Sequence, residues 1–167
     1  MKFSPLSGIQ DWSIGQDVLE DIYEEPPQSD DPAFIVFFGL RDSDQRHRLY
    51  RIPASTPIAD VVHAFQVGSH GAESYGDDVA QTVRLVAEKA TQIGQIVSCR
   101  VIFADTAGLK LKFLRQINDS EVERLEALFP PDKQMQAGLE RYISEWEGHG
   151  PLLSPVKQEN MIHLWWD

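Results

Sequence analysis

The residue types best suited to catalysis gather in one glycine-bearing stretch, residues 67–78. A hydroxyl, an imidazole and several carboxylates lie close together there, on Ser69, His70, Glu73, Asp77 and Asp78. Such groups can supply the nucleophile, the base and the acid of a hydrolytic reaction. The stretch has neither the lysine of a phosphate-binding loop nor the strand–turn–helix pattern of a nucleophile elbow. We therefore interpret it as a polar loop in which Asp77 caps the next helix, and retain a small hydrolase-like enzyme as an alternative.

Metal binding and thiol chemistry find little support in the sequence. The five histidines never show the paired spacing of a zinc-binding helix, and one cysteine cannot form a thiolate cluster. Asp60 and His63 stand three positions apart on one predicted helix and could seat two ligands, but a solvent-facing pair is the better explanation. Cys99 lies in an apolar run without a base beside it, as a core residue would. We predict no metal site and no cofactor.

Charge is distributed unevenly along the chain, whose formal net charge is −11. Residues 1–45 contain ten acidic and two basic side chains, whereas residues 46–118 contain six acidic and nine basic ones. Nucleic-acid binding needs a strongly basic surface, so this balance disfavours nucleic acid as a general partner. It permits a basic protein partner.

The acidic residues near the N-terminus follow a helical pattern. Ile14, Val18 and Ile22 recur at the spacing of one helix face, which predicts a helix over residues 14–25 followed by an exposed linker at residues 26–32. Carboxylates crowd the opposite face without basic partners, which costs an isolated helix roughly 0.2–0.5 kcal/mol per like-charged pair. This arrangement suggests a partner outside the helix, although solubility alone also explains it. The predicted partner-binding residues are Asp17, Glu20, Asp21, Glu24, Glu25, Asp30 and Asp31.

The other patterns predict strands joined in hairpins, with helices between them. Apolar runs over residues 33–40 and 47–52 indicate one hairpin, residues 95–104 and 109–117 a second, and residues 161–166 a terminal strand. Helices are expected after Thr56 and Pro57, from Asp77 or Asp78 to Gly94, after a capping box of Ser120 and Glu123, and after Asp132. We therefore expect a single α+β domain over residues 1–167, with a mainly antiparallel sheet built from the two hairpins and the C-terminal strand, and about five helices.

Basic side chains stand on both predicted hairpins. They would form one patch if the hairpin strands were neighbours, although pairing with nearby carboxylates is the simpler role. The residues concerned are Arg46, Arg48, Arg51, Lys110, Lys112 and Arg115.

The sequence also bears on location. No apolar stretch approaches the roughly 20 residues of a membrane helix, and residues 1–10 do not form a signal peptide. A single cysteine suits a reducing compartment. We expect a cytoplasmic protein that does not bind membranes.

Together these observations favour a non-catalytic binding protein that docks a basic protein partner through an acidic surface. Bacterial immunity proteins, inhibitors and adaptors include small acidic proteins of this kind, which is an analogy of class only. Two alternatives remain open: the hydrolase-like enzyme, with His149 as a further candidate, and a structural subunit that joins an assembly through its aromatic C-terminus. An enzyme is expected to place His70 and carboxylates in a concave site, whereas a binding protein presents a broad acidic face.

Overall fold

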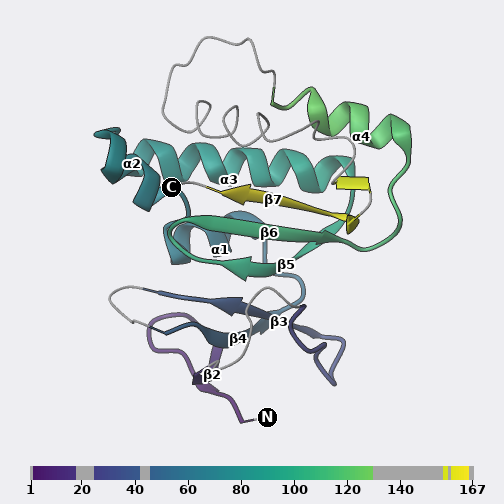
Figure 1. Cartoon of the computed structure of the whole chain (residues 1–167). Helices are drawn as coiled ribbons and strands as arrows, with labels where there is room; N and C mark the ends of the chain where they lie inside the picture. Colours follow the sequence, from purple (N-terminus) through teal and green to yellow (C-terminus); the bar gives the residue numbers. More distant parts are fainter. Residues whose placement is uncertain (1, 18–24, 42–45, 130–155, 158, 166–167) are drawn as a thin grey trace.

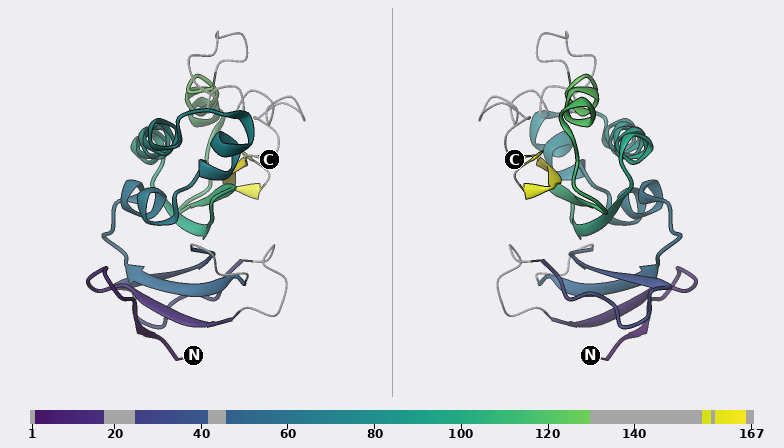
Figure 2. Two further views of the ribbon diagram at one scale, coloured as in Figure 1. Left: turned by 90° about the vertical axis from the view of Figure 1, so that its left-hand side faces the viewer. Right: turned by 90° about the vertical axis from the view of Figure 1, so that its right-hand side faces the viewer.

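The computed structural model describes residues 2–17, 25–41, 46–129, 156–157 and 159–165 (Figure 1). Seven strands form one sheet: β1 (Ser4–Pro5), β2 (Ser13–Asp17), β3 (Phe34–Gly39), β4 (Arg48–Pro53), β5 (Cys99–Ala104), β6 (Gly108–Phe113) and β7 (Met161–Trp165). Four helices lie in the described residues: α1 (Ile58–Phe65), α2 (Ser69–Tyr75), α3 (Val79–Ile96) and α4 (Asp119–Glu126). In both views of Figure 2, α4 and strands β1–β4 lie at opposite ends of the molecule.

The sheet has the order β1-β2-β4-β3-β5-β6-β7. Its neighbouring strands are antiparallel except for β3 and β5, which run parallel where the second hairpin joins the first. The predicted mainly antiparallel sheet is thus confirmed, as are both hairpins, β3–β4 and β5–β6. The predicted terminal strand is confirmed as well, because β7 pairs with β6 along its length.

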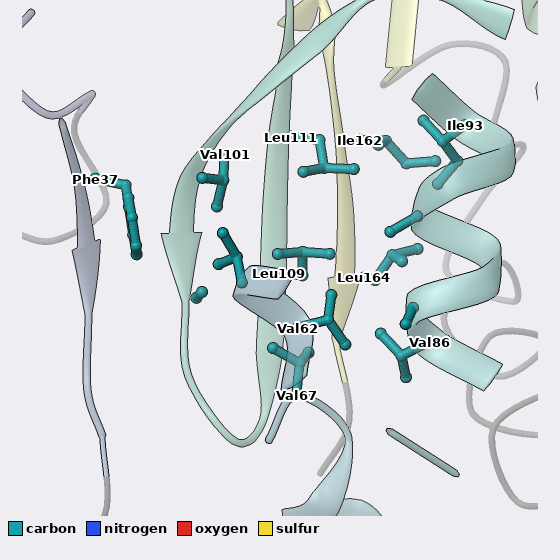
Figure 3. Packing of buried hydrophobic residues seen from close by; sticks show 14 of the residues in the cluster. Phe37, Val62, Val67, Val86, Ile93, Val101, Leu109, Leu111, Ile162 and Leu164 are labelled. Atoms are coloured by element: carbon teal, nitrogen blue, oxygen red, sulfur yellow. The ribbon is translucent and has the colours of Figure 1, made fainter. Parts of the chain in front are cut away.

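The main hydrophobic core lies between one face of the sheet and the helices. Alternate residues of each strand point to this face, and Figure 3 shows Leu111, Ile162 and Leu164 directed toward α3. From α3 itself, Val86 and Ile93 complete the contact with no exposed surface. Fully burying one such aliphatic side chain stabilises a fold by roughly 1.5–3 kcal/mol.

The opposite face of the sheet carries a smaller apolar cluster among basic side chains. Val36, Phe38, Leu49 and Phe103 form this cluster, and Phe3 packs against it. The alternation that sends Phe37 and Tyr50 to the main core sends Val36, Phe38 and Leu49 to the other side. Phe103 reaches that side because the register of β5 shifts between Val101 and Phe103. We call this side the outer face.

The predicted helix over residues 14–25 is wrong at its start. Residues 13–17 form β2, in which Ser13 and Ile14 stand opposite Arg51 and Tyr50 of β4. Sheet pairing satisfies the backbone hydrogen-bonding groups of this segment, and three apolar residues at helical spacing are too weak a signal to oppose it. Residues 18–24 lie outside the described residues. In the predicted linker at residues 26–32, Pro26 is buried, whereas most of the other residues are exposed.

Three other local predictions also need correction. The stretch over residues 67–78 is not a loop throughout, because it contains α2. Helix α3 continues through Gly94 to Ile96, since packing of the fully buried Ile93 outweighs the weak helix propensity of glycine. Helix α1 begins at Ile58 after Pro57, without the predicted side-chain cap from Thr56.

The predicted capping box is displaced by two residues. Asn118 and Glu121 form it in place of Ser120 and Glu123, and α4 therefore begins at Asp119. The helix expected after Asp132 lies outside the described residues.

Candidate functional site

The catalytic candidates of the hydrolase-like alternative differ in their surroundings. Ser69 is buried in α2, whereas His70 and Glu73 are exposed. Consecutive helical residues point about 100° apart, which separates the hydroxyl from the imidazole. The backbone N–H groups of Gly68 and His70 both donate to the Thr106 carbonyl, at 3.0 and 3.2 Å, so α2 is fixed to the turn between β5 and β6.

The carboxylates that follow α2 take a structural role. Asp78 accepts a hydrogen bond from the Gln81 N–H at 2.8 Å and caps α3. The predicted cap, Asp77, lies one residue before it. The stretch therefore ends in a helix cap, as interpreted, but the capping residue is Asp78 and not Asp77.

The predicted partner-binding carboxylates differ in their surroundings. Glu25 Oε1 lies 3.1 Å from Lys112 Nζ on the outer face. Asp31 Oδ1 accepts a hydrogen bond from the Ala33 N–H at 2.9 Å and closes a turn, whereas Asp30 is exposed. Asp17 ends β2 opposite Arg48. The remaining three, Glu20, Asp21 and Glu24, lie outside the described residues, as does His149.

The two hairpins do not place their basic strands side by side, because β3 and β5 separate β4 from β6. Several of these side chains contact groups within the fold. The Arg51 guanidinium lies over the rings of Phe3 and Phe34, 4.7 and 5.1 Å from their centroids. Lys110 Nζ lies 5.5 Å from the Phe103 centroid. The simpler expectation of pairing with carboxylates thus fits Lys112 and Arg115, whereas Arg51 and Lys110 contact aromatic rings.

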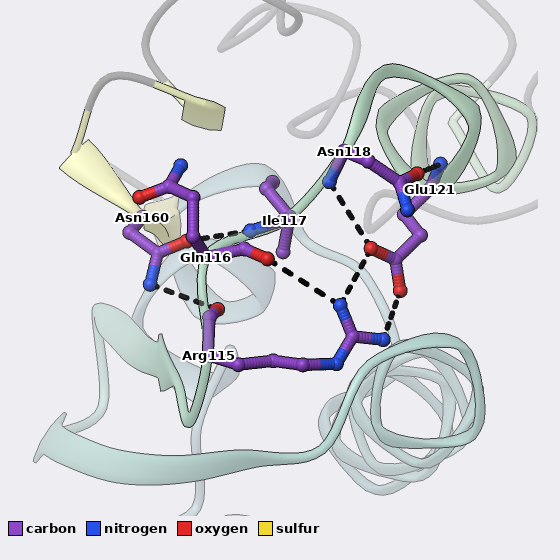
Figure 4. A network of polar contacts seen from close by, with 6 residues as sticks. All are labelled: Arg115, Gln116, Ile117, Asn118, Glu121 and Asn160. Atoms are coloured by element: carbon purple, nitrogen blue, oxygen red, sulfur yellow. Dashed lines mark hydrogen bonds and ion pairs between the residues drawn. The ribbon is translucent and has the colours of Figure 1, made fainter.

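Arg115 belongs to the polar network shown in Figure 4, which joins the end of β6 to α4. Its Nη1 donates to Glu121 Oε1 at 2.7 Å, and its Nη2 donates to the second carboxylate oxygen. Hydrogen bonds from the Arg115 side chain, supported by the Asn118 N–H, lower the pKa of Glu121 from 4.5 to about 2. Asn160 donates to the Arg115 carbonyl and accepts from the Ile117 N–H, so the start of β7 is held there too.

A second polar cluster lies on the outer face near the turn between β5 and β6. His47 Nε2 is 3.4 Å from Asp105 Oδ2, and its ring packs against Phe103 at 5.5 Å between centroids. His163 stands opposite Lys110 in the β6–β7 ladder. Burial, with a smaller contribution from Lys110, lowers the pKa of His163 from 6.5 to about 4, which leaves this imidazole neutral at pH 7.

No sequence pattern indicated this cluster, because its members come from segments far apart in the chain. A carboxylate beside a histidine can orient the imidazole for proton transfer. Within the described residues, however, no three His, Cys, Asp or Glu side chains lie where they could hold a metal ion. Burial raises the pKa of the Cys99 thiol to about 12, so this cysteine is protonated at pH 7.

A groove of about 560 Å³ lies beside the first turn of α1. Trp12 lines it from the loop before β2, together with Asp11, while Asp60 and His63 line it from α1. Asp60 and His63, the pair on one predicted helix, therefore line a concave surface. An aspartate and a tryptophan from a distant loop line it with them. A second groove, of about 520 Å³, is also lined by residues 9–12.

Comparisons with protein-family models, with curated proteins and with solved structures find no match for this chain. Among the described residues, no helix is both long and apolar enough to cross a membrane.

Proposed function

We propose that this protein is a non-catalytic binding protein that docks a basic protein partner through an acidic surface. The observation that carries the proposal is that basic side chains contact other groups of the same chain. The chain has 26 acidic and 15 basic side chains. Internal contacts engage Arg41, Arg51, Lys89, Lys110, Lys112, Arg115 and Lys157.

The excess of acidic over basic side chains gives the protein its formal net charge of −11. Each ion pair, such as Lys112 with Glu25, neutralises one acid and one base and leaves the excess of carboxylates unchanged. Exposed carboxylates occur on several elements, among them Glu73 on α2, Glu88 on α3 and Glu123 on α4. A surface of one sign attracts a partner of opposite charge and speeds its encounter.

The acidic segment, defined as residues 17–31, is the proposed contact region. Because Glu25 and Asp31 contact groups of this chain, the test leaves these two unchanged and substitutes Glu20, Glu24 and Asp30. An immunity, inhibitor or adaptor role in the cytoplasm belongs to the same proposal, and its only support is the size and charge of the chain.

The test is affinity capture from the source cell, followed by mass spectrometry, with three forms of the protein. These are wild type, Glu20→Lys/Glu24→Lys/Asp30→Lys, and a matched control, Glu73→Lys/Glu88→Lys/Glu123→Lys. Both variants change the net charge equally, so only the location of the change differs. We expect wild type and control to retain one basic protein that the first variant loses.

Two results would contradict the proposal. One is retention of the same protein in equal amount by the acidic-segment variant, with circular dichroism showing that all three forms are folded. The other is an acidic protein as the captured partner.

A further inference from the structure

The groove beside α1 combines apolar walls with exposed negative charge. Trp12 forms part of its lining and is only 6% exposed, and Pro53 and Pro57 add further apolar surface. Asp11 and Asp60 line the same groove and are exposed to solvent. All of the lining residues are described, and no lysine or arginine is among them. The groove therefore complements a cation carried on an apolar stem.

An arginine side chain matches this combination better than a lysine side chain. A planar guanidinium is weakly hydrated and can donate hydrogen bonds to more than one carboxylate, whereas an ammonium is a compact and strongly hydrated charge. The methylene groups of arginine can cover apolar surface such as that of the two prolines. We propose that the groove receives an arginine side chain of the partner protein, an inference that rests on the proposed function.

The neighbouring groove favours a polypeptide over a free amino acid. Both grooves are lined by Ile9, Gln10, Asp11 and Trp12 and therefore lie against the same loop. The second groove adds apolar surface from Pro5 and Leu6. A chain that places an arginine beside an apolar residue can fill both grooves, whereas free arginine fills only the first.

The experiment uses a blocked arginyl-leucine dipeptide and the full-length protein labelled with ¹⁵N. The indole N–H signal of Trp12 is assigned from the spectrum of Trp12→Phe. We expect the dipeptide to shift this signal along a saturable curve, and a dipeptide with citrulline, which is close to arginine in shape but uncharged, to leave it in place. A lysyl-leucine dipeptide is expected to bind more weakly than the arginine form.

The variants locate the binding charge. Asp60→Asn is expected to weaken the arginine dipeptide about two- to fivefold, the range for one exposed charge pair. Glu88→Gln removes one carboxylate charge from an exposed position on α3 outside the groove and is expected to leave the affinity unchanged. Amide signals away from the substituted residues should be the same in both variants, which shows that each is folded.

Equal shifts with the citrulline or lysine dipeptide would overturn the inference, and so would equal affinities for the two variants. These failures are separable from failure of the proposed function. If the dipeptides do not bind the groove but Glu20→Lys/Glu24→Lys/Asp30→Lys still loses the captured protein, only the groove assignment is wrong. If that variant keeps the captured protein, the proposed function is wrong.

Discussion

Arg115 and Glu121 show how a single charged pair can organise a junction between elements. The arginine lies two residues after the end of β6, and the glutamate occupies the first turn of α4, where a negative charge also interacts favourably with the helix dipole. Both guanidinium nitrogens at the end of Arg115 contact the carboxylate, so the pair has the bidentate geometry that distinguishes strong ion pairs from weak surface contacts. These residues are therefore structural.

The lowered pKa of Glu121 predicts how stability depends on pH. A carboxyl whose pKa falls on folding stabilises the native state above its unfolded pKa, and this contribution is lost as the pH falls toward its folded pKa. For Glu121 that interval runs from 4.5 down to about 2. We expect Glu121→Gln, which retains the capping geometry, to be less stable than wild type at pH 7 and to approach it at low pH.

Urea unfolding between pH 7 and pH 2 measures this difference. Glu123→Gln, an exposed residue on the same helix, is the matched control. A difference between wild type and Glu121→Gln that stays constant across the whole range would contradict the assignment of the ion pair.

At the scale of elements, the sequence pattern and the structure differ at the start of α4. Ser120 and Glu123 match a capping box in the sequence, but Asn118 and Glu121 form it. The position of the capping box depends on contacts of Glu121 with Arg115, a residue outside the helix. The local sequence pattern therefore could not decide between the two possible capping boxes.

Truncating each candidate cap distinguishes the two possible capping boxes. Asn118→Ala removes the side chain that accepts from the Glu121 N–H, and should destabilise the protein by roughly 0.5–2 kcal/mol, the usual cost of losing an N-cap. Ser120→Ala, an exposed position inside the helix, should change stability by less than about 0.5 kcal/mol. Equal losses in urea unfolding would refute the observed cap.

The strand β7 shows what sequence could predict well. Its alternation sends Ile162 and Leu164 into the core, where they are 0% and 1% exposed, and β6 provides the antiparallel neighbour. The N-terminal segment shows the opposite case. Ile14 belongs to a strand because it pairs with β4, about 35 residues away along the chain. The local spacing of apolar residues cannot indicate such a long-range contact.

A matched pair of leucines tests the role of β7. Leu164→Ala should lower the free energy of unfolding by about 2–5 kcal/mol, because it creates a cavity in a core that packs against α3. Leu114→Ala removes the same atoms from a side chain that is 62% exposed, and should cost less than about 0.5 kcal/mol. Thermal or urea unfolding of both variants provides the measurement, and similar losses would argue against burial of β7.

The sequence predicted only part of the candidate site. It identified Asp60 and His63 as neighbours on one helix, but their companions Asp11 and Trp12 come from a loop about 50 residues earlier. That loop reaches α1 because β2 pairs with β4, and the sequence indicated a helix in place of β2. A groove assembled by long-range strand pairing carries no local pattern, so it became visible only with the fold.

At the scale of the whole molecule, the excess of acid over base is the feature that most constrains function. The net charge of −11 cannot be neutralised by internal pairing, and its field extends into solvent over distances set by ionic strength. A basic partner approaching this field is steered before any contact forms, so association should be fast at low salt and slower as salt is added.

The most direct test of the account is therefore the association rate of the captured partner, measured by stopped flow across a salt series. For wild type, the rate should fall steeply as the screening length shortens to about 8–10 Å near physiological ionic strength. Glu20→Lys/Glu24→Lys/Asp30→Lys should associate more slowly at low salt and show a shallower dependence, while Glu73→Lys/Glu88→Lys/Glu123→Lys should remain closer to wild type. Equal rates and equal salt slopes for wild type and the acidic-segment variant would contradict the proposed role of the acidic surface.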